Sequence, residues 1–411
     1  MPKTSLRALS ARAIVTAIAD AADRWSDADF PPRVRATQTI ETRTGYTTPV
    51  VEYALDRLFF SLTREALDAA IGDELGSLDA LDGFVARRGR PDGFARGVDR
   101  VVVVASDTTI GVSLVPAMFA LCAKASVLIK DRNDTLLAAF IETLIEERPE
   151  FAEAIITQKW RGGDDAREAA LLGAADVIVA FGGPDALVAI RAHAGPDATF
   201  VPFGHRLSIG VLDAAAFAAL DVDARRALAE GIARDALLYD GEGCLSLHAL
   251  FVTGNDHDPA TGDSVAAGLA AAFERVAVEF PAGALDAGRA ATAAAHRLLL
   301  TFRAAQDGVP PPSPMLDFSA PLTAPPALVP RLLPVYVVRD LAAVAAFVER
   351  HRLPVQALGI ADPADPDVRA FAETIGAVRI ARLGTMQAPP LAGRHGGRPR
   401  ITDFVRWLDA E

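Results

Sequence analysis

The chain has 411 residues, half of them hydrophobic, and a formal net charge of −12 at pH 7. A chain of this length and composition buries a large core and makes two or three domains. Its acidic balance, with no basic run among aromatic residues, argues against nucleic-acid binding and favours small-molecule partners. Two cysteines, Cys122 and Cys244, form neither a disulfide framework nor a Cys-x-x-Cys motif. We therefore expect a cytoplasmic protein without a bound metal.

The N-terminal part of the chain predicts helices. Residues 5–27 are rich in alanine, but their acidic residues and the lack of a continuous apolar run exclude a secretory signal. Further helices are expected over residues 46–81, with Phe59, Phe60 and Leu62 as buried anchors. No stretch approaches the roughly 20 apolar residues that cross a bilayer, so membrane insertion is not expected.

Strands and helices alternate regularly from Asp99. The predicted strands cover residues 101–105, 126–130, 154–159, 176–181 and 199–203, with helices between them. Alternation at this spacing predicts a parallel sheet with right-handed crossovers. Such sheets bind ligands at the carboxyl ends of their strands. The loops expected to carry function are therefore 106–111, 130–133, 182–184 and 204–206.

Two of these loops contain residues suited to a cofactor. Gly182 and Gly183 join a strand to a helix, where glycine lets the backbone approach a phosphate and the helix N-terminus adds partial positive charge. A plain tight turn is the alternative, because the chain has no Gly-x-Gly-x-x-Gly motif. Lys130 ends a buried strand, where an unpaired ammonium is costly. It either reaches ribose hydroxyls or phosphate, or extends to the surface.

The chain beyond Arg206 predicts a second α/β region. Its expected strands cover residues 208–213, 245–253, 334–338, 356–361 and 378–381. Its expected helices cover residues 221–240, 264–279, 287–306, 341–351 and 365–375. Proline-rich residues 309–330 form a connection, and residues 384–400 predict a linker to a short final helix over 401–409.

Cys244 lies on the predicted turn between a helix and a strand. Such a turn holds a nucleophile clear of the core, with backbone N–H groups aimed at the group that it attacks. A bare thiol has a pKa of about 8.5, so activation requires a neighbouring dipole or base. A small buried hydrophobe is the alternative for Cys244, and it is the prediction for Cys122 in its apolar helix.

Three segments resemble the LuxC-like acyl-CoA reductases of the aldehyde dehydrogenase superfamily, one member of which supplies the fatty aldehyde of bacterial luminescence. The strongest likeness is DALLYDGEGCLSLH at residues 235–248, supported by AADVIVAFGGPDA at 174–186 and IARLGTMQAP at 380–389. The resemblance implies an aldehyde-dehydrogenase-like α/β fold of two parallel-sheet domains, with the active site in the cleft between them. Residues 1–205 with 385–411 would bind the cofactor, and residues 206–384 would carry the catalytic cysteine.

The same resemblance implies reduction of an acyl-CoA thioester, with fatty acyl-CoA as the expected substrate, to the aldehyde. Cys244 would attack the thioester carbonyl as a thiolate, coenzyme A would leave, and a nicotinamide would reduce the acyl-enzyme. Asp107 occupies the position of the superfamily's oxyanion-binding asparagine. Because a carboxylate donates a hydrogen bond only when protonated, Thr108 or Thr109 is the alternative donor.

One absence favours this branch over aldehyde oxidation. Hydrolytic members of the superfamily use a glutamate to activate water, whereas the matching segment here, residues 201–208, contains no carboxylate. Without a base the acyl-enzyme persists long enough for exchange with coenzyme A or for reduction. Glu242, two residues from the thiol, is either an alternative base or a surface residue of the turn.

The expected cofactor contacts are Ser106, Lys130, Arg132, Asn133, Gly182, Gly183 and Gly204. NAD-selective relatives have a glutamate three residues beyond the lysine, where this chain has Asn133 beside Arg132. A 2′-phosphate would meet no repulsion there, so NADPH is the expected cofactor and NADH the alternative.

Two rival functions stay open. Another acylating member of the superfamily, such as a short-chain acyl-CoA or γ-glutamyl phosphate reductase, would share the cysteine and the missing base. A non-catalytic nucleotide-binding scaffold would use Cys244 for packing alone. The expected partners are acyl-CoA, coenzyme A and further copies of the chain in a homo-oligomer, with an acyl-transferring protein as an open alternative.

Overall fold

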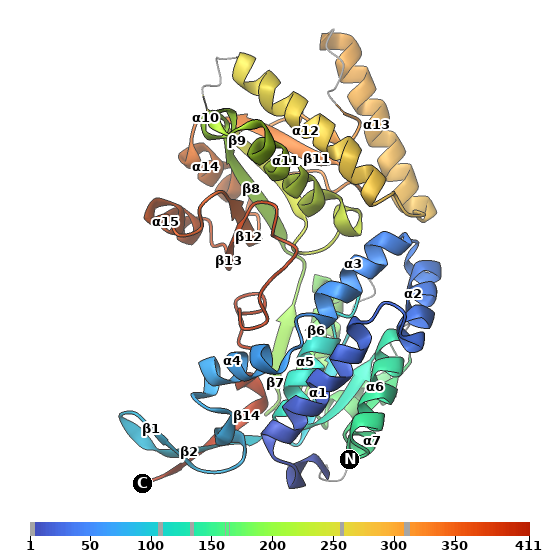
Figure 1. Cartoon of the computed structure of the whole chain (residues 1–411), viewed down its shortest axis with the longest axis vertical. Helices are drawn as coiled ribbons and strands as arrows, with labels where there is room; N and C mark the ends of the chain where they lie inside the picture. Colours follow the sequence, from blue (N-terminus) through green and yellow to red (C-terminus); the bar gives the residue numbers. More distant parts are fainter. Residues whose placement is uncertain are drawn as a thin grey trace. The chain divides into compact units, whose positions relative to one another are not determined.

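The computed structural model describes residues 5–105, 110–131, 135–160, 162–163, 165–254, 259–307 and 313–411. The chain divides into two compact units. The first unit comprises Met1–Arg43, Val51–His205 and Pro390–Glu411, and the second comprises Thr44–Val50 and Arg206–Pro389. Each unit has its own parallel sheet flanked by helices (Figure 1).

The first unit is built on a five-stranded parallel sheet in the order β5-β4-β3-β6-β7. Its strands are β3 (Arg100–Val104), β4 (Ser126–Lys130), β5 (Ile155–Gln158), β6 (Val177–Phe181) and β7 (Thr199–Phe203). β4 and β6 are buried along their whole length, as expected for central parallel strands covered by helices on both faces. The parallel sheet predicted from the sequence is confirmed.

Helices surround this sheet. They are α1 (Ala11–Ser26), α2 (Pro31–Thr44), α3 (Thr48–Phe59), α4 (Arg64–Leu75), α5 (Leu114–Cys122), α6 (Thr135–Glu147), α7 (Phe151–Ala154), α8 (Asp165–Leu172) and α9 (Pro184–Ala192). α1 packs against α5 and α6 on one side of the sheet (Figure 1). The ring of Trp25 lies 5.0 Å from that of Phe59 in this layer.

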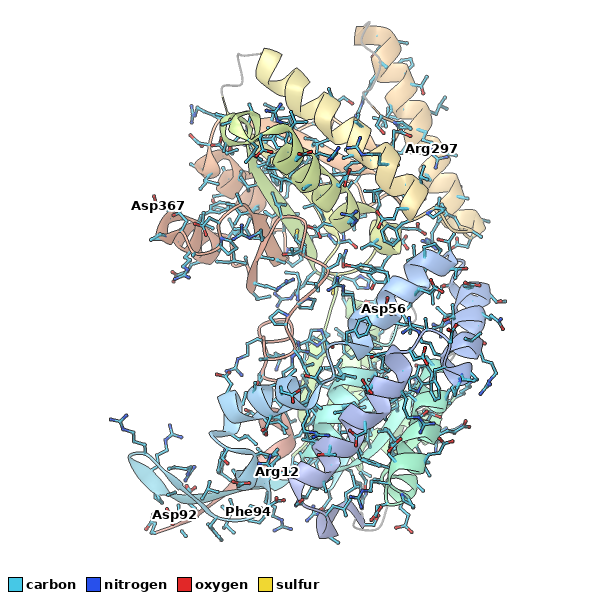
Figure 2. The ribbon with its side chains drawn as sticks, viewed as in Figure 1. Arg12, Asp56, Asp92, Phe94, Arg297 and Asp367 are labelled. Atoms are coloured by element: carbon cyan, nitrogen blue, oxygen red, sulfur yellow. The ribbon has the colours of Figure 1, made fainter. Side chains whose placement is uncertain are left out.

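The buried anchors predicted near the end of α3 are confirmed in part. Phe59 and Leu62 are buried, but Phe60 is 59% exposed. Successive side chains of a helix point in different directions, so Phe59 takes the core position and turns Phe60 outward. On the same helix, Asp56, labelled in Figure 2, pairs with the buried guanidinium of Arg33 at 2.6 Å.

A three-stranded antiparallel sheet, β1-β2-β14, completes the first unit. It consists of β1 (Val85–Arg87), β2 (Arg90–Gly97), which carries Asp92 and Phe94 of Figure 2, and β14 (Val405–Ala410). The short helix predicted over 401–409 is therefore wrong. β14 pairs with β2 from Val405 opposite Gly97 to Ala410 opposite Asp92, and this long-range ladder overrides the local helical pattern.

The second unit contains a six-stranded parallel sheet in the order β10-β11-β9-β8-β12-β13. Its strands are β8 (Leu207–Asp213), β9 (Leu247–Thr253), β10 (Leu316–Asp317), β11 (Leu333–Val338), β12 (Val355–Ile360) and β13 (Arg379–Arg382). Its helices are α10 (Ala214–Ala219), α11 (Val222–Leu237), α12 (Pro259–Glu279), α13 (Ala287–Asp307), α14 (Leu341–His351) and α15 (Pro366–Thr374). α14 and α15 share a core with the sheet in which Phe251, Tyr336 and Phe347 pack ring to ring.

On the other face of this sheet, α11 ends shortly before Cys244 in the chain. α11 is capped by Asp221, whose side chain accepts a hydrogen bond from the backbone of Ala224, and the helix packs on α12 (Figure 1). None of the described helices is both long and apolar enough to cross a membrane.

Candidate active site

Cys244 lies on a sharply bent turn between α11 and β9. After α11, a short 3-10 helix (Leu238–Gly241) contains three successive residues with left-handed backbone: Tyr239, Asp240 and Gly241, with φ of 55°, 54° and 77°. Non-glycine residues rarely adopt this conformation, and each costs of order 1 kcal/mol or more unless the surroundings hold it. The turn predicted from the sequence is confirmed, and it places the Cys244 side chain at the surface.

Ion pairs of the buried Asp240 side chain stabilise this bend. The Asp240 carboxylate is 3% exposed and lies 3.3 Å from the guanidinium of Arg289 and 3.5 Å from that of Arg331. The backbone N–H of Arg331 also donates to the carbonyl of Asp240 at 2.8 Å. These contacts offset the strain of the left-handed residues, so the bend keeps one conformation.

The segment Thr44–Val50 packs against the same turn. The Tyr46 hydroxyl donates to the carbonyl of Tyr239 at 3.4 Å, and the two rings meet edge to face. Gly45 accepts a hydrogen bond from the backbone of Ala284 at 2.8 Å. A Cβ at Gly45 would lie 2.2 Å from the Ala284 oxygen, so this close approach requires glycine.

Hydrogen bonds from β8 and β9 fix the residues next to the sulfur. The Ser208 hydroxyl donates to the carbonyl of Cys244 at 2.7 Å, and the Ser208 backbone N–H donates to Nδ1 of His248 at 3.0 Å. Burial lowers the pKa of His248 to about 4, so this imidazole is neutral at physiological pH. His248 therefore acts as a hydrogen-bond acceptor within the turn, and its accepting Nδ1 is already used.

The surroundings of Cys244 act on the pKa of its thiol in two opposed directions. Desolvation by the surrounding protein raises the pKa of the thiol, although the backbone N–H groups of Cys244 and Leu245 and the guanidinium of Arg379 act in the opposite direction. The net shift is upward, so these groups do not overcome the effect of burial. The same N–H groups that favour the thiolate are also suited to hold an oxyanion formed beside the sulfur.

A buried carboxyl group organises the loop on the other side of the cysteine. Asp235 is 1% exposed and accepts hydrogen bonds from the backbone of Gly384 at 2.6 Å and of Met386 at 2.9 Å. Burial raises its pKa to about 7, against these N–H groups and the nearby Arg379. The Gln387 amide donates both to the Asp235 carbonyl and to the Ser246 hydroxyl, and so connects this loop with the cysteine turn.

The two proposed roles of Glu242 can be compared with its contacts. Its carboxylate lies 2.6 Å from the guanidinium of Arg289. Desolvation raises the pKa of Glu242 and Arg289 opposes that shift. A base that accepts a proton here would have to give up its ion pair, so the geometry favours a structural surface residue.

The comparisons with known proteins show the family and the fold of this chain. The family described as acyl-CoA reductase (LuxC) matches residues 6–407. The chain belongs to this family. A long-chain acyl-protein thioester reductase from Aliivibrio fischeri is 21% identical over 261 residues, which are 60% of this chain and 51% of that protein. A second such reductase, from Photobacterium leiognathi, is 28% identical over 124 residues, 30% of this chain and 24% of that protein.

The longest of these alignments span about half the length of the curated relatives. Solved structures show the fold of this family member more completely. An NAD-dependent benzaldehyde dehydrogenase from Corynebacterium glutamicum has a TM-score of 0.68 at 16% identity, over 98% of this chain and 86% of its own. An acetylating aldehyde dehydrogenase from Geobacillus thermoglucosidasius has a TM-score of 0.66 at 15% identity, over 98% and 92%. The predicted aldehyde dehydrogenase fold of two parallel-sheet domains is confirmed.

The predicted cofactor contacts of this LuxC-family chain fall into two groups. Ser106, Arg132 and Asn133, together with the oxyanion candidates Asp107, Thr108 and Thr109, lie outside the described residues. Lys130, Gly182, Gly183 and Gly204 lie at the carboxyl ends of β4, β6 and β7, within the first unit. The described members therefore gather at one edge of one parallel sheet.

The glycine pair after β6 fits a phosphate group. Gly183 is the N-cap of α9 without a side-chain cap, and Pro184 begins that helix. The free backbone N–H groups of a helix N-terminus suit an anion, and a side chain at Gly183 would approach His205 at 3.5 Å. Asp185 in the first turn opposes an anion, but it is exposed. The residues present thus fit a dinucleotide phosphate.

Several residues of the site gave no sequence signal. Ser208, Asp235, Gln387 and Arg379 come from four separate segments and meet the cysteine turn only through the folded sheet. Glu168, which pairs with Lys130, was missed for the same reason. A buried acidic residue in an otherwise apolar helix face is the kind of signal that suggests a partner of opposite charge.

Proposed function

We propose that this protein reduces an acyl-CoA thioester, with a fatty acyl chain, to the corresponding aldehyde through an acyl-enzyme on Cys244. The main support for this proposal is the position of Cys244 together with the absence of a nearby base in the sequence. An exposed cysteine sits on a braced, left-handed turn, and no carboxylate free to activate water lies in the adjoining segment 201–208. Family membership supports the same chemistry.

The first step is attack of the Cys244 thiolate on the thioester carbonyl. A carbon–sulfur bond to Cys244 forms, the bond to the coenzyme A sulfur breaks, and coenzyme A leaves as a thiolate that takes up a proton from water. The backbone N–H groups of Cys244 and Leu245 are suited to stabilise the oxyanion, and each such donor contributes about 3 kcal/mol in comparable sites. Arg379 helps to ionise the thiol.

The acyl-enzyme must then escape hydrolysis. His248 is neutral with its Nδ1 occupied by Ser208, and Glu242 is paired with Arg289, so neither is positioned to activate water. A bound reduced nicotinamide would supply the hydride that the acyl carbon needs. Breaking of the bond between that carbon and the Cys244 sulfur would then release the aldehyde and return the cysteine as a thiolate.

NADPH is the proposed reductant. The support is the loop after Lys130, where Arg132 and Asn133 replace the carboxylate of NAD-selective relatives. Gly182 and Gly183 would hold the dinucleotide phosphates against the N-terminus of α9. A cytoplasmic location suits the cofactor and the two free thiols, Cys122 and Cys244.

An acyl-protein thioester is the second candidate substrate. The curated relatives are named long-chain acyl-protein thioester reductases, so their acyl donor is a protein. The chemistry at Cys244 is the same for both donors, since each presents a thioester or equivalent acyl group. The two candidates differ only in the leaving group.

The test measures NADPH oxidation with a panel of acyl-CoA thioesters of different chain length, and mass spectrometry of the protein without reductant. We expect turnover with long-chain acyl-CoA and an acyl adduct on Cys244 that disappears in Cys244→Ala. Cys122→Ala is the matched control, because Cys122 is fully buried in α5 and its pKa is raised to about 12.

Unchanged turnover in Cys244→Ala would contradict the proposal. Turnover with acyl-protein but not with acyl-CoA would select the second substrate, and turnover with short-chain acyl-CoA or γ-glutamyl phosphate alone would select a rival enzyme.

A further inference from the structure

A buried charged cluster lies at the carboxyl end of β4. The Lys130 ammonium, whose residue is 8% exposed, forms an ion pair with the Glu168 carboxylate, which is 5% exposed. The indole N–H of Trp160 donates to the same carboxylate oxygen at 3.0 Å, and the ammonium lies 4.7 Å from the centre of the indole ring. The lysine was expected to reach a cofactor or the surface, but it is held against a carboxylate.

The three residues come from two neighbouring strand ends and a helix. Lys130 ends β4, Trp160 follows β5, and Glu168 lies on α8. β4 and β5 are neighbouring parallel strands, with Lys130 opposite Gln158. The carboxyl edge of such a sheet is where a nucleotide binds, so a charge placed here acts directly on the nucleotide.

Hydrogen bonds to Glu168 favour its ionised form. Burial would raise the pKa of this carboxyl group, but the Lys130 ammonium, the Trp160 indole and the backbone N–H of Gly163 together lower it. The ionised carboxylate therefore stays paired with the Lys130 ammonium at neutral pH. The Lys130 charge, which would attract a 2′-phosphate, is neutralised by the same pairing.

We infer that Glu168 sets the cofactor preference by neutralising the Lys130 ammonium, which would otherwise attract the 2′-phosphate of NADPH at the carboxyl end of β4. The inference rests on the proposed function, because it concerns the nicotinamide site of that reaction. Without this attraction the site discriminates less against NADH, which makes NADH a usable cofactor. It acts through its charge and through Lys130, so removal of the charge changes discrimination between cofactors more than it changes affinity for both.

The experiment measures the dissociation constants of NADPH and NADH by titration calorimetry for the whole protein and for Glu168→Gln. The substitution removes the charge and leaves Lys130 free to meet the 2′-phosphate. We expect the ratio of the NADH constant to the NADPH constant to rise about tenfold, since one pKa unit of charge interaction corresponds to that factor. Glu153→Gln, an exposed acid on α7 of the same unit, is the control and leaves the ratio unchanged.

A double variant separates the charge effect from a loss of packing. In Lys130→Met/Glu168→Gln the gain in NADPH preference disappears, because the freed ammonium is absent. Glu168→Asp keeps the charge and holds the ratio nearer to that of the unsubstituted protein, even where the shorter side chain lowers stability. An equal change in both constants, or a shift of Glu168→Gln toward NADH, overturns the inference.

The two proposals fail in different ways. Tight binding of a nicotinamide with the expected effect of Glu168→Gln, but without turnover of any acyl thioester, upholds the inference and contradicts the proposed function. Turnover with an unchanged cofactor ratio in Glu168→Gln does the reverse. Both readings use the binding titration, which requires no catalysis.

Discussion

The Ser208 hydroxyl donates a 2.7 Å hydrogen bond to the carbonyl oxygen of Cys244. Ser208 stands on β8 and Cys244 on the turn before β9, and these two strands are neighbours in the second unit's sheet. The bond therefore ties the peptide group of Cys244, the proposed nucleophile, to the sheet. A nucleophile held in this way keeps its sulfur and its backbone N–H groups in register with a bound carbonyl.

Ser208→Ala is expected to lower the free energy of unfolding by about 1 kcal/mol, the usual loss for one such hydrogen bond. It is also expected to lower the rate of acylation of Cys244, because the turn loses its hydrogen bond to β8. Chemical denaturation and single-turnover kinetics measure the two effects. Ser61→Ala is the control, because Ser61 makes an equivalent 2.8 Å bond to the carbonyl of Leu58. A control that slowed acylation as much as Ser208→Ala would contradict the assignment.

The raised pKa of Cys244 predicts a pH profile for alkylation. Burial favours the thiol, so the rate of reaction with iodoacetamide is expected to keep rising above about pH 8.5, the pKa of a free thiol. Arg379→Gln removes the positive charge that favours the thiolate, moves the profile to higher pH and slows alkylation at pH 8 by about threefold to tenfold. Arg382→Gln, at an exposed position of the same strand, serves as the control. An identical profile in both variants would exclude Arg379 from activation.

His248 predicts acid sensitivity of the fold. Its pKa is about 4 in the folded protein and about 6.5 when unfolded, so the unfolded chain binds more protons between these values and stability falls as pH drops through them. The contribution of this group between pH 6.5 and pH 5 is about 2 kcal/mol. His248→Asn keeps an acceptor for the Ser208 N–H and is expected to flatten the pH dependence of unfolding over that range. His205→Asn, at an exposed histidine, should leave the slope as it is.

Asp240 and Glu242 both pair with Arg289 but differ in burial. Asp240→Asn removes a buried carboxylate that pairs with two partly buried guanidinium groups, so we expect a loss of about 3 kcal/mol in the free energy of unfolding. Glu242→Gln removes an exposed ion pair, and the expected loss is below about 1 kcal/mol. Turnover of Glu242→Gln should stay within about twofold. A loss of several hundredfold, in the range typical of a missing general base, would instead support Glu242 as the base.

The prediction of elements from sequence was most accurate where each strand or helix carried its own local signal. β3, β4 and β6 are continuous apolar runs bounded by turns, and such runs predict buried parallel strands without further information. The end of the chain had no such signal. Residues 405–410 become a strand only because β2, far away in sequence, supplies the opposite half of the ladder.

Phe60 and the segment Thr44–Val50 show a related limit. An apolar residue near a helix end predicts burial, yet only the packing of α3 decides which of two adjacent phenylalanines faces the core. Thr44–Val50 lies among the first unit's helices in sequence but belongs to the second unit. Its place depends on Gly45 meeting Ala284 and Tyr46 meeting Tyr239.

By itself, the sequence determined the two α/β regions, the family and the turn that presents Cys244, because apolar periodicity and a glycine-flanked cysteine are local properties of the chain. Only the tertiary structure decided the direction in which the pKa of that thiol shifts, the pairing of Lys130 with Glu168 and the contacts of Asp235. Charge, burial and hydrogen bonding at a site are set by groups that arrive from distant segments. Their effect exists only once the sheets have brought those segments together.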